Sequence, residues 1–214
     1  MGPFTAFTAN TLARIAAPFF PGLVWRRDDG TRTVYLTFDD GPTEETPALL
    51  DLLARHDAPA SFFFLGAAVR KHPDLARAAR DAGHTVGQHT DTHPDPWKTA
   101  PTEVLAECAA ATETIEDALG EGIGWMRPPY GHVTSTLRAW CDVRDQEIAM
   151  WDVMPGDFLP SSTAAGVADH VERRVRPGSL VVLHEGGHAE RITPAALDRL
   201  LPRLAADGYR FAAL

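Results

Sequence analysis

The stretch TVYLTFDDGP at residues 33–42 decides the fold class. It begins as a run of β-branched and aromatic residues at 34–38, which is typical of a buried strand. The carboxylates of Asp39 and Asp40 follow directly, and a Gly-Pro pair then turns the chain. The stretch therefore joins a predicted strand to ionisable side chains, and this arrangement recurs along the chain.

Six further runs resemble strands, and stretches with helical spacing lie between them. The predicted strands are 34–38, 60–64, 85–87, 123–126, 148–151, 180–183 and 209–212. The predicted helices are 46–55, 73–82, 101–119, 133–140, 163–174 and 194–206. Strand and helix alternate without a long polar linker, which predicts one α/β domain with a mainly parallel sheet, open or closed into a barrel.

Ionisable residues follow five of the predicted strands. They are Asp39 and Asp40, His89 and His93, Arg127, Asp152 and Asp157, and His184 and Glu185. The carboxyl ends of parallel strands meet at one edge of a sheet, where α/β proteins assemble their sites. The sequence therefore predicts one composite site.

Composition excludes several other classes of protein. The chain has 214 residues, of which 44% are hydrophobic, so it can bury a single large core. Its 20 Lys and Arg against 29 Asp and Glu give a net charge of −9, which disfavours nucleic acid and anionic lipid as partners. Two cysteines, Cys108 and Cys141, are too few for a disulfide framework, although one bridge stays open.

No apolar run approaches the roughly 18 to 20 residues that a membrane span requires. The first 25 residues lack the basic and then apolar pattern of a signal peptide. We therefore expect no membrane span and a cytoplasmic location.

His89 and His93 stand four residues apart in QHTDTH, which would place both imidazoles on one face of a helical turn. A catalytic metal needs a third protein ligand and an open position. Asp39 and Asp40 supply carboxylates for two tasks, because one can bind a cation while its neighbour acts as a base. Each pattern alone has an ordinary alternative: surface or core histidines, and an Asp-Gly-Pro turn.

Five blocks in order carry a family resemblance. They are TFDDGP, HTDTH, RPPYG, WDVMPGDF and VVLHE, which lie between residues 37 and 185. In this order they resemble the polysaccharide deacetylases, also called NodB-homology or carbohydrate esterase family 4 enzymes. The resemblance covers nearly all the chain after about residue 33. It implies a distorted (β/α) barrel of about seven strands at 33–214, and metal-dependent removal of N-acetyl groups from an N-acetylglucosamine-containing polysaccharide or oligosaccharide.

Residues 1–32 would then form an N-terminal extension. Four bulky or rigid residues in it favour packing on the barrel over disorder: Pro18, Phe19, Phe20 and Trp25. The sequence leaves the oligomeric state open.

The resemblance assigns roles by position. Asp40, His89 and His93 would bind the metal, with Zn²⁺ as first choice and Co²⁺, Ni²⁺ or Mn²⁺ as alternatives. Asp39 would be the general base, held in place by Arg127.

The remaining catalytic roles fall in the last three blocks. The backbone N–H of Tyr130 would stabilise the oxyanion, presented by the rigid Pro128 and Pro129. His184 would be the general acid, and Asp157 would keep its imidazole charged and oriented.

Predicted substrate-binding residues surround these groups: Tyr130, Pro129, Trp151, Phe158 and Val182. Val182 would line the site of the acetyl methyl group. Trp97 and Trp151 are the best candidates to stack on a sugar ring, although a tryptophan is more often part of a core.

Three residues depart from the family pattern and leave substrate specificity open. Met154 stands where many members have Asp, Phe158 where many have Trp, and Glu185 where Asp is common. Two other functions therefore stay open. One is a small-amide hydrolase of the same fold that works without this metal site, and the other is a non-catalytic glycan-binding protein.

Overall fold

A curled parallel sheet forms the centre of the molecule. The computed structural model describes residues 22–27 and 29–214 of the chain. The strands lie in the order β1-β6-β5-β4-β3-β2-β7, and β8 pairs with the start of β2. Their bounds are β1 Leu23–Val24, β2 Thr33–Asp39, β3 Ser61–Phe64, β4 Thr85–Gln88, β5 Trp125–Met126, β6 Glu147–Ala149, β7 Ser179–His184 and β8 Arg210–Phe211.

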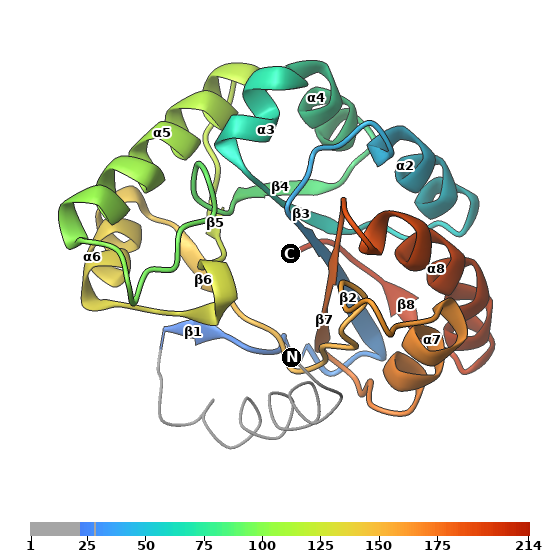
Figure 1. Cartoon of the computed structure of the whole chain (residues 1–214). Helices are drawn as coiled ribbons and strands as arrows, with labels where there is room; N and C mark the ends of the chain where they lie inside the picture. Colours follow the sequence, from blue (N-terminus) through green and yellow to red (C-terminus); the bar gives the residue numbers. More distant parts are fainter. Residues whose placement is uncertain (1–21, 28) are drawn as a thin grey trace.

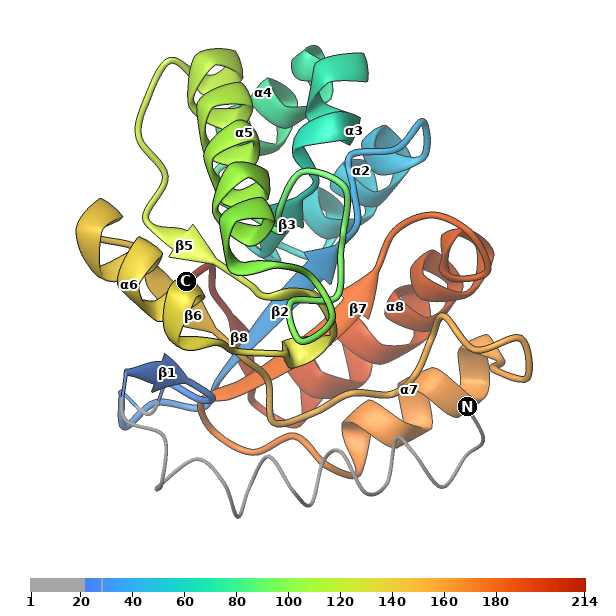
Figure 2. The same ribbon diagram turned by 60° about the vertical axis from the view of Figure 1, so that its left-hand side comes forward.

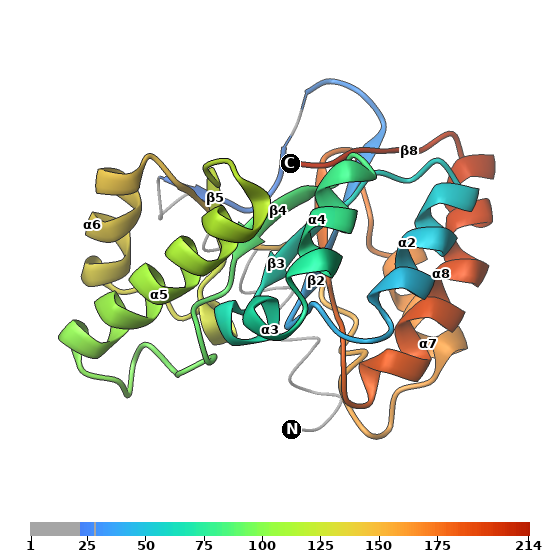
Figure 3. The ribbon, with the colours of Figure 1, turned by 90° about the horizontal axis from the view of Figure 1, so that it is seen from above.

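The helices cover the outside of this sheet (Figure 1). They are α2 Thr46–Arg55, α3 Gly66–Lys71, α4 Pro73–Asp81, α5 Pro101–Leu119, α6 Ser135–Arg144, α7 Ala164–Glu172 and α8 Ala189–Ala206. Figures 1 and 3 both place α5 and α6 on one flank and α2, α7 and α8 on the other. The arrangement confirms the predicted (β/α) barrel, which is incompletely closed.

β2 pairs with three other strands, and its apolar sequence fits that buried position. All seven of its residues are buried, since it is covered on both faces and pairs with β3 and with β7. β2 and β7 run side by side through the middle of the molecule (Figure 2). Both strands end at the same edge, where Asp39 is in register with His184.

Two main apolar clusters stabilise the fold, beside a third group of only three buried residues. The larger one packs aromatic residues of β2 and β3 against α2 and α8, and its Phe38 and Phe62 rings stack 5.1 Å apart. The smaller one includes Cys108 of α5 and Cys141 of α6. Both thiols are free and buried, and burial raises the pKa of each to about 12. The two cysteines therefore serve as apolar packing residues, without a bridge.

All seven predicted strands and all six predicted helices are present. The helices at 46–55 and 101–119 have the predicted bounds. Three helix starts were wrong. Thr134 and Thr163 cap the helices predicted from 133 and 163, so α6 begins at Ser135 and α7 at Ala164. α8 begins at Ala189 and contains Pro194, where the prediction began.

Two elements were not predicted, and both are too short to show a period. α3 has six residues, and β1 has two. β1 lies inside the predicted extension at 1–32, where its parallel pairing with β6 makes it part of the sheet. Trp25 packs against the smaller cluster, whereas Pro18, Phe19 and Phe20 lie outside the described residues. The division at residue 32 stays a prediction.

Within the part of the chain that the structure describes, none of the helices is long and apolar enough to span a lipid bilayer.

Candidate metal centre and active site

Three side chains from two strand ends converge on one point. Asp40 follows β2, His89 follows β4, and His93 lies four residues further on. One potential ligand atom from each lies within 4.8 Å of the others. The Nε2 atoms of His89 and His93 lie 3.8 and 3.6 Å from the same Asp40 oxygen, Oδ1. The structure therefore brings together the three residues that were predicted as metal ligands.

The chain between the two histidines is not a helical turn, so that premise was wrong. Residues 89–93 form an irregular loop in which Thr90 and His93 both have a φ of 66°. The backbone N–H of His93 donates to the hydroxyl of Thr90 (3.2 Å). The loop folds back on itself, and the imidazoles meet because of this reversal rather than through helical spacing.

A carboxylate on α5 and an arginine of α3 hold this loop. Glu107 Oε2 accepts hydrogen bonds from the backbone N–H groups of Asp91 (3.1 Å) and Thr92 (2.7 Å), and Oε1 accepts one from the Thr92 hydroxyl (2.8 Å). Arg70 donates to Asp91 Oδ2 at 2.6 Å. Glu107 was not predicted as part of the site, because nothing in its local sequence distinguishes it from the other acidic residues of α5.

The environment of His89 selects the form that binds metals. Its Nδ1 lies 2.6 Å from the carbonyl oxygen of Arg127, which can only accept, so Nδ1 carries the proton. Nε2 then presents its lone pair to Asp40 and His93. Burial lowers the pKa of His89 to about 3, which keeps the ring neutral. The donor set of two imidazole nitrogens and one carboxylate oxygen fits a divalent cation with an open coordination position.

Asp39 and Arg127 form a buried ion pair beside this centre. Arg127 Nη1 donates to Asp39 Oδ1 and to the Thr37 hydroxyl, each at 2.7 Å. Its other nitrogens donate to the carbonyl oxygens of Met150 (2.9 Å) and Ala149 (3.3 Å). Arg127 is fully buried and ties together the ends of β2, β5 and β6. The remaining oxygen of Asp39, Oδ2, lies 3.9 Å from His89 Nε2.

His184 and Asp157 form a second pair across the site. Asp157 Oδ1 lies 2.9 Å from His184 Nδ1, and Oδ2 accepts from the backbone N–H of His184 and from the Thr193 hydroxyl, each at 2.7 Å. Burial by itself lowers the pKa of His184, but the charge and hydrogen bond of Asp157, helped by Asp39 and Asp40, outweigh it and raise the pKa to about 9. In the metal-free protein the imidazole is therefore protonated at neutral pH.

A cavity of about 620 Å³ opens beside these groups. Its walls include Asp39, Asp40, His89, His93 and His184, together with Tyr130, Trp151, Met154, Phe158 and Val182. Four of the five predicted substrate-binding residues thus border one space. Pro129 does not: it is buried, and the neighbouring Pro128 lines the cavity instead.

Tyr130 adopts an uncommon backbone conformation at the rim of this cavity. It lies in the short 3-10 turn Pro129–Gly131 with a φ of 58°, in the left-handed region that non-glycine residues seldom adopt. Its side chain is exposed, and its ring meets that of His93 edge to face, with centroids 4.7 Å apart.

Comparison with known proteins identifies the family. A family model described as polysaccharide deacetylase matches residues 26–143, which is more than half of the chain. The chain belongs to the polysaccharide deacetylase family. It is 36% identical to a chitooligosaccharide deacetylase of Bradyrhizobium over 89% of this chain and 94% of that protein.

Solved structures agree with the assignment to this family of metal-dependent deacetylases. A peptidoglycan N-acetylglucosamine deacetylase superposes with a TM-score of 0.86 at 30% identity, over 95% of both chains. A family pseudoenzyme from Bacillus anthracis has a TM-score of 0.82 at 26% identity, over 91% of this chain and 68% of that one. These findings confirm the predicted fold and the predicted class of enzyme, a carbohydrate N-deacetylase.

In this deacetylase, Glu185 links two sides of the site and was left without a role by the sequence. It is buried, and its Oε2 accepts a hydrogen bond from the Thr46 hydroxyl, which in turn accepts one from the backbone N–H of Thr43 (2.8 Å). A Cβ on Gly41 would overlap with the Glu185 carboxylate, so a larger residue there would have to displace that carboxylate. Burial raises the pKa of Glu185 to about 7. The carboxyl group thus packs the loop after Asp40 against the end of β7.

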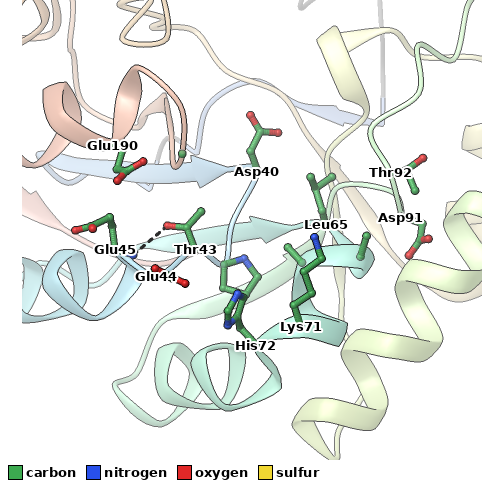
Figure 4. A pocket seen from close by; sticks show the side chains of 14 residues that line it. Asp40, Thr43, Glu44, Glu45, Leu65, Lys71, His72, Asp91, Thr92 and Glu190 are labelled. Carbon is green, nitrogen blue, oxygen red and sulfur yellow. Dashed lines mark hydrogen bonds between the residues drawn. The ribbon is translucent and has the colours of Figure 1, made fainter.

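A second cavity, of about 550 Å³, shares Asp40 with the first (Figure 4). It extends towards Leu65 and Lys71, and the carboxylates of Glu44 and Glu190 stand on its other side. Its rim carries charges of both signs.

Proposed function

We propose that this chain is a metal-dependent hydrolase that removes N-acetyl groups from a polysaccharide or oligosaccharide containing N-acetylglucosamine. One observation carries the proposal: the three candidate metal ligands, Asp39 of the Asp-Arg pair and His184 of the Asp-His pair all line the same cavity. The names of the relatives, which act on chitooligosaccharide and on peptidoglycan N-acetylglucosamine, support the choice of substrate class.

Asp40, His89 and His93 would hold a divalent cation. Zn²⁺ is the first choice, because two imidazoles and one carboxylate with an open position are typical of catalytic zinc, while Co²⁺, Ni²⁺ and Mn²⁺ also accept such ligands. When bound, the cation supplies Lewis-acid polarisation of the acetyl carbonyl and lowers the pKa of water.

Asp39 is proposed as the general base. Arg127 fixes its Oδ1, so that Oδ2, on the side of His89, is the oxygen that accepts a proton from the attacking water. Arg127 also compensates the charge of this buried carboxylate and orients it without taking part in proton transfer.

His184 is proposed as the general acid. Asp157 holds Nδ1, which leaves Nε2 to donate a proton to the amine as the amide C–N bond breaks and acetate forms. The backbone N–H of Tyr130, in its left-handed turn, is the proposed donor to the oxyanion. Val182 and Trp151 provide apolar walls against which the acetyl group and the sugar ring can pack.

The test is acetate release from N-acetylglucosamine oligomers and from peptidoglycan, measured after chelation and again after addition of Zn²⁺, Co²⁺ or Mn²⁺. We expect no release after chelation and recovery with at least one metal. Asp39→Asn should keep the metal and lose about 10²-fold or more in kcat. Tight metal binding without acetate from any substrate would refute the proposal and favour the non-catalytic alternative. Metal-independent hydrolysis of small amides would favour the alternative of a small-amide hydrolase.

A further inference from the structure

Trp97 is a large apolar side chain that the fold leaves in solvent. It lies in the loop between β4 and α5, and 66% of its surface is exposed. A single exposed apolar side chain is common on protein surfaces and needs no explanation by itself. Trp97 differs, since several contacts fix its orientation.

One face of the indole lies flat on His132. The two ring centroids are 3.6 Å apart and the planes are inclined by 2°. Trp97 Nε1 donates to the carbonyl oxygen of Val133 (3.2 Å), and the backbone N–H of Trp97 donates to Asp95 Oδ1 (3.0 Å). His132 is held in turn, because its Nδ1 lies 2.7 Å from the same Asp95 oxygen. These contacts hold the indole by its Nε1 edge and on one face, and they fix the backbone beside it, while much of its surface stays open to solvent.

A row of aromatic rings connects Trp97 with the candidate metal centre. The ring centroids of His93 and Tyr130 are 4.7 Å apart, and those of Tyr130 and His132 are 5.7 Å apart. His132 in turn stacks on Trp97. Asp95, Tyr130 and His132 also line the 620 Å³ cavity, together with Lys98, whose ammonium group lies 2.9 Å from Asp95 Oδ2. A row of rings thus leads from a metal ligand to the surface.

We propose that the open face of Trp97 is a subsite for a second sugar ring of the substrate chain, one that neighbours the ring whose N-acetyl group is removed. The inference rests on the proposed function. A pyranose ring has an apolar face of C–H groups and a polar edge of hydroxyls. The indole matches the face, and Asp95 and Lys98 offer an acceptor and a donor beside it for the edge.

The fixed orientation explains why such a platform would be useful. A side chain that is already fixed in one orientation loses little rotamer entropy when a ligand binds. A modest contact area then yields measurable affinity. The subsite would thus make the enzyme favour chains over single sugars.

Calorimetry with the chelated full-length protein tests this without turnover, using N-acetylglucosamine monomer and tetramer as probes. Wild type should bind the tetramer more tightly than the monomer. Trp97→Ala should weaken tetramer binding about tenfold and leave monomer binding unchanged, whereas Trp97→Phe should keep most of the affinity. Val143→Ala, which trims an 85% exposed side chain on α6, is the matched control and should change nothing. Thermal unfolding shows that each variant is folded.

Equal tetramer affinity of wild type and Trp97→Ala overturns the subsite, and so does a wild type that binds the tetramer no better than the monomer. Acetate release separates this failure from failure of the proposed function. If Trp97-dependent tetramer binding occurs without acetate release under any metal, the subsite stands and the function fails. If acetate is released equally by wild type and Trp97→Ala at every chain length, the function stands and the subsite fails.

Discussion

Asp39 and Asp40 are neighbours in the chain, yet they occupy opposite environments. Asp39 is the last residue of β2, is 3% exposed and pairs with the fully buried Arg127. Asp40 lies just beyond the strand at a φ of 74°, and about a third of its side chain is open to the cavity. The residues of the site therefore fall into two groups. The buried group, with Asp39 and Arg127, stabilises the folded state, whereas the open group, with Asp40 and His93, serves only to bind the metal.

The largest effect is expected from Arg127→Met, which removes one partner of the buried pair. The carboxylate of Asp39 is then buried without compensation, so the free energy of unfolding should fall by about 3–5 kcal/mol, and acetate release should be lost. Urea denaturation measures the first quantity. Addition of Asp39→Asn in the same chain should restore part of the stability but no activity. If the single Arg127→Met variant were as stable as wild type, the buried pair would not be needed for the folded state.

His93→Ala tests the open group. The His93 side chain is one quarter exposed, and its removal leaves no buried charge. The free energy of unfolding of the metal-free variant should therefore lie within about 1 kcal/mol of the wild-type value. Metal binding should fail, and acetate release should drop by about 10³-fold or more. His56→Ala, at the end of α2, is the histidine control that should behave as wild type. A strongly destabilised metal-free His93→Ala would show that this ligand also supports the fold.

Asp157→Asn sharpens the comparison, because its partner His184 is only partly buried. The pKa of His184 is raised to about 9 by Asp157 against its burial, above the roughly 6.5 of an unfolded histidine. The stabilisation from this pair is therefore complete below about pH 6.5 and lost as the pH rises through about 9.

In the chelated protein, NMR titration should place the His184 pKa near 9 in wild type and clearly lower in Asp157→Asn. The alkaline limb of kcat should move to lower pH in the variant, with a loss of about 10²-fold near neutrality. If the alkaline limb of the kcat profile were unchanged in Asp157→Asn, a group other than His184 would donate the proton to the leaving amine.

The smallest effect is expected from Glu107→Ala. This change frees the backbone N–H groups of Asp91 and Thr92 and loosens the loop that carries His93. Metal affinity should fall by about tenfold, as for other groups that orient a ligand, while thermal stability changes little. Glu113→Ala, an exposed residue on the same helix, controls for helix propensity. Unchanged metal affinity would show that the loop holds its shape without Glu107.

The sequence predicts what periodicity and residue type determine. Every strand with a clear apolar run was found, and so was each ionisable residue at its end. Elements of two and six residues, β1 and α3, were missed because they are shorter than any period. The loop at 89–93 was given the wrong conformation, since two of its backbone N–H groups donate to Glu107, 14 positions after His93, and no local pattern reveals these bonds.

The site shows the same limit. The residues proposed as metal ligands and proton-transfer groups could be named from five blocks of sequence, but the positioning groups could not. Glu107 and Thr193 act through distances that only the fold creates, and Glu185 acts through its close approach to Gly41. Pro129 was chosen as a substrate contact on the same evidence as Tyr130, but Pro128 lines the cavity in its place.

The network around Arg127 also bears on how such an enzyme can lose its reaction over time. Its guanidinium joins three strands and one carboxylate, so a lineage that loses Arg127 first leaves the Asp39 carboxylate buried without its partner and passes through a poorly folded intermediate. Changes at Asp40 or His93 carry no such penalty. Descendants that keep the scaffold and abandon catalysis should therefore lose the exposed ligands early and retain Arg127 as a relic.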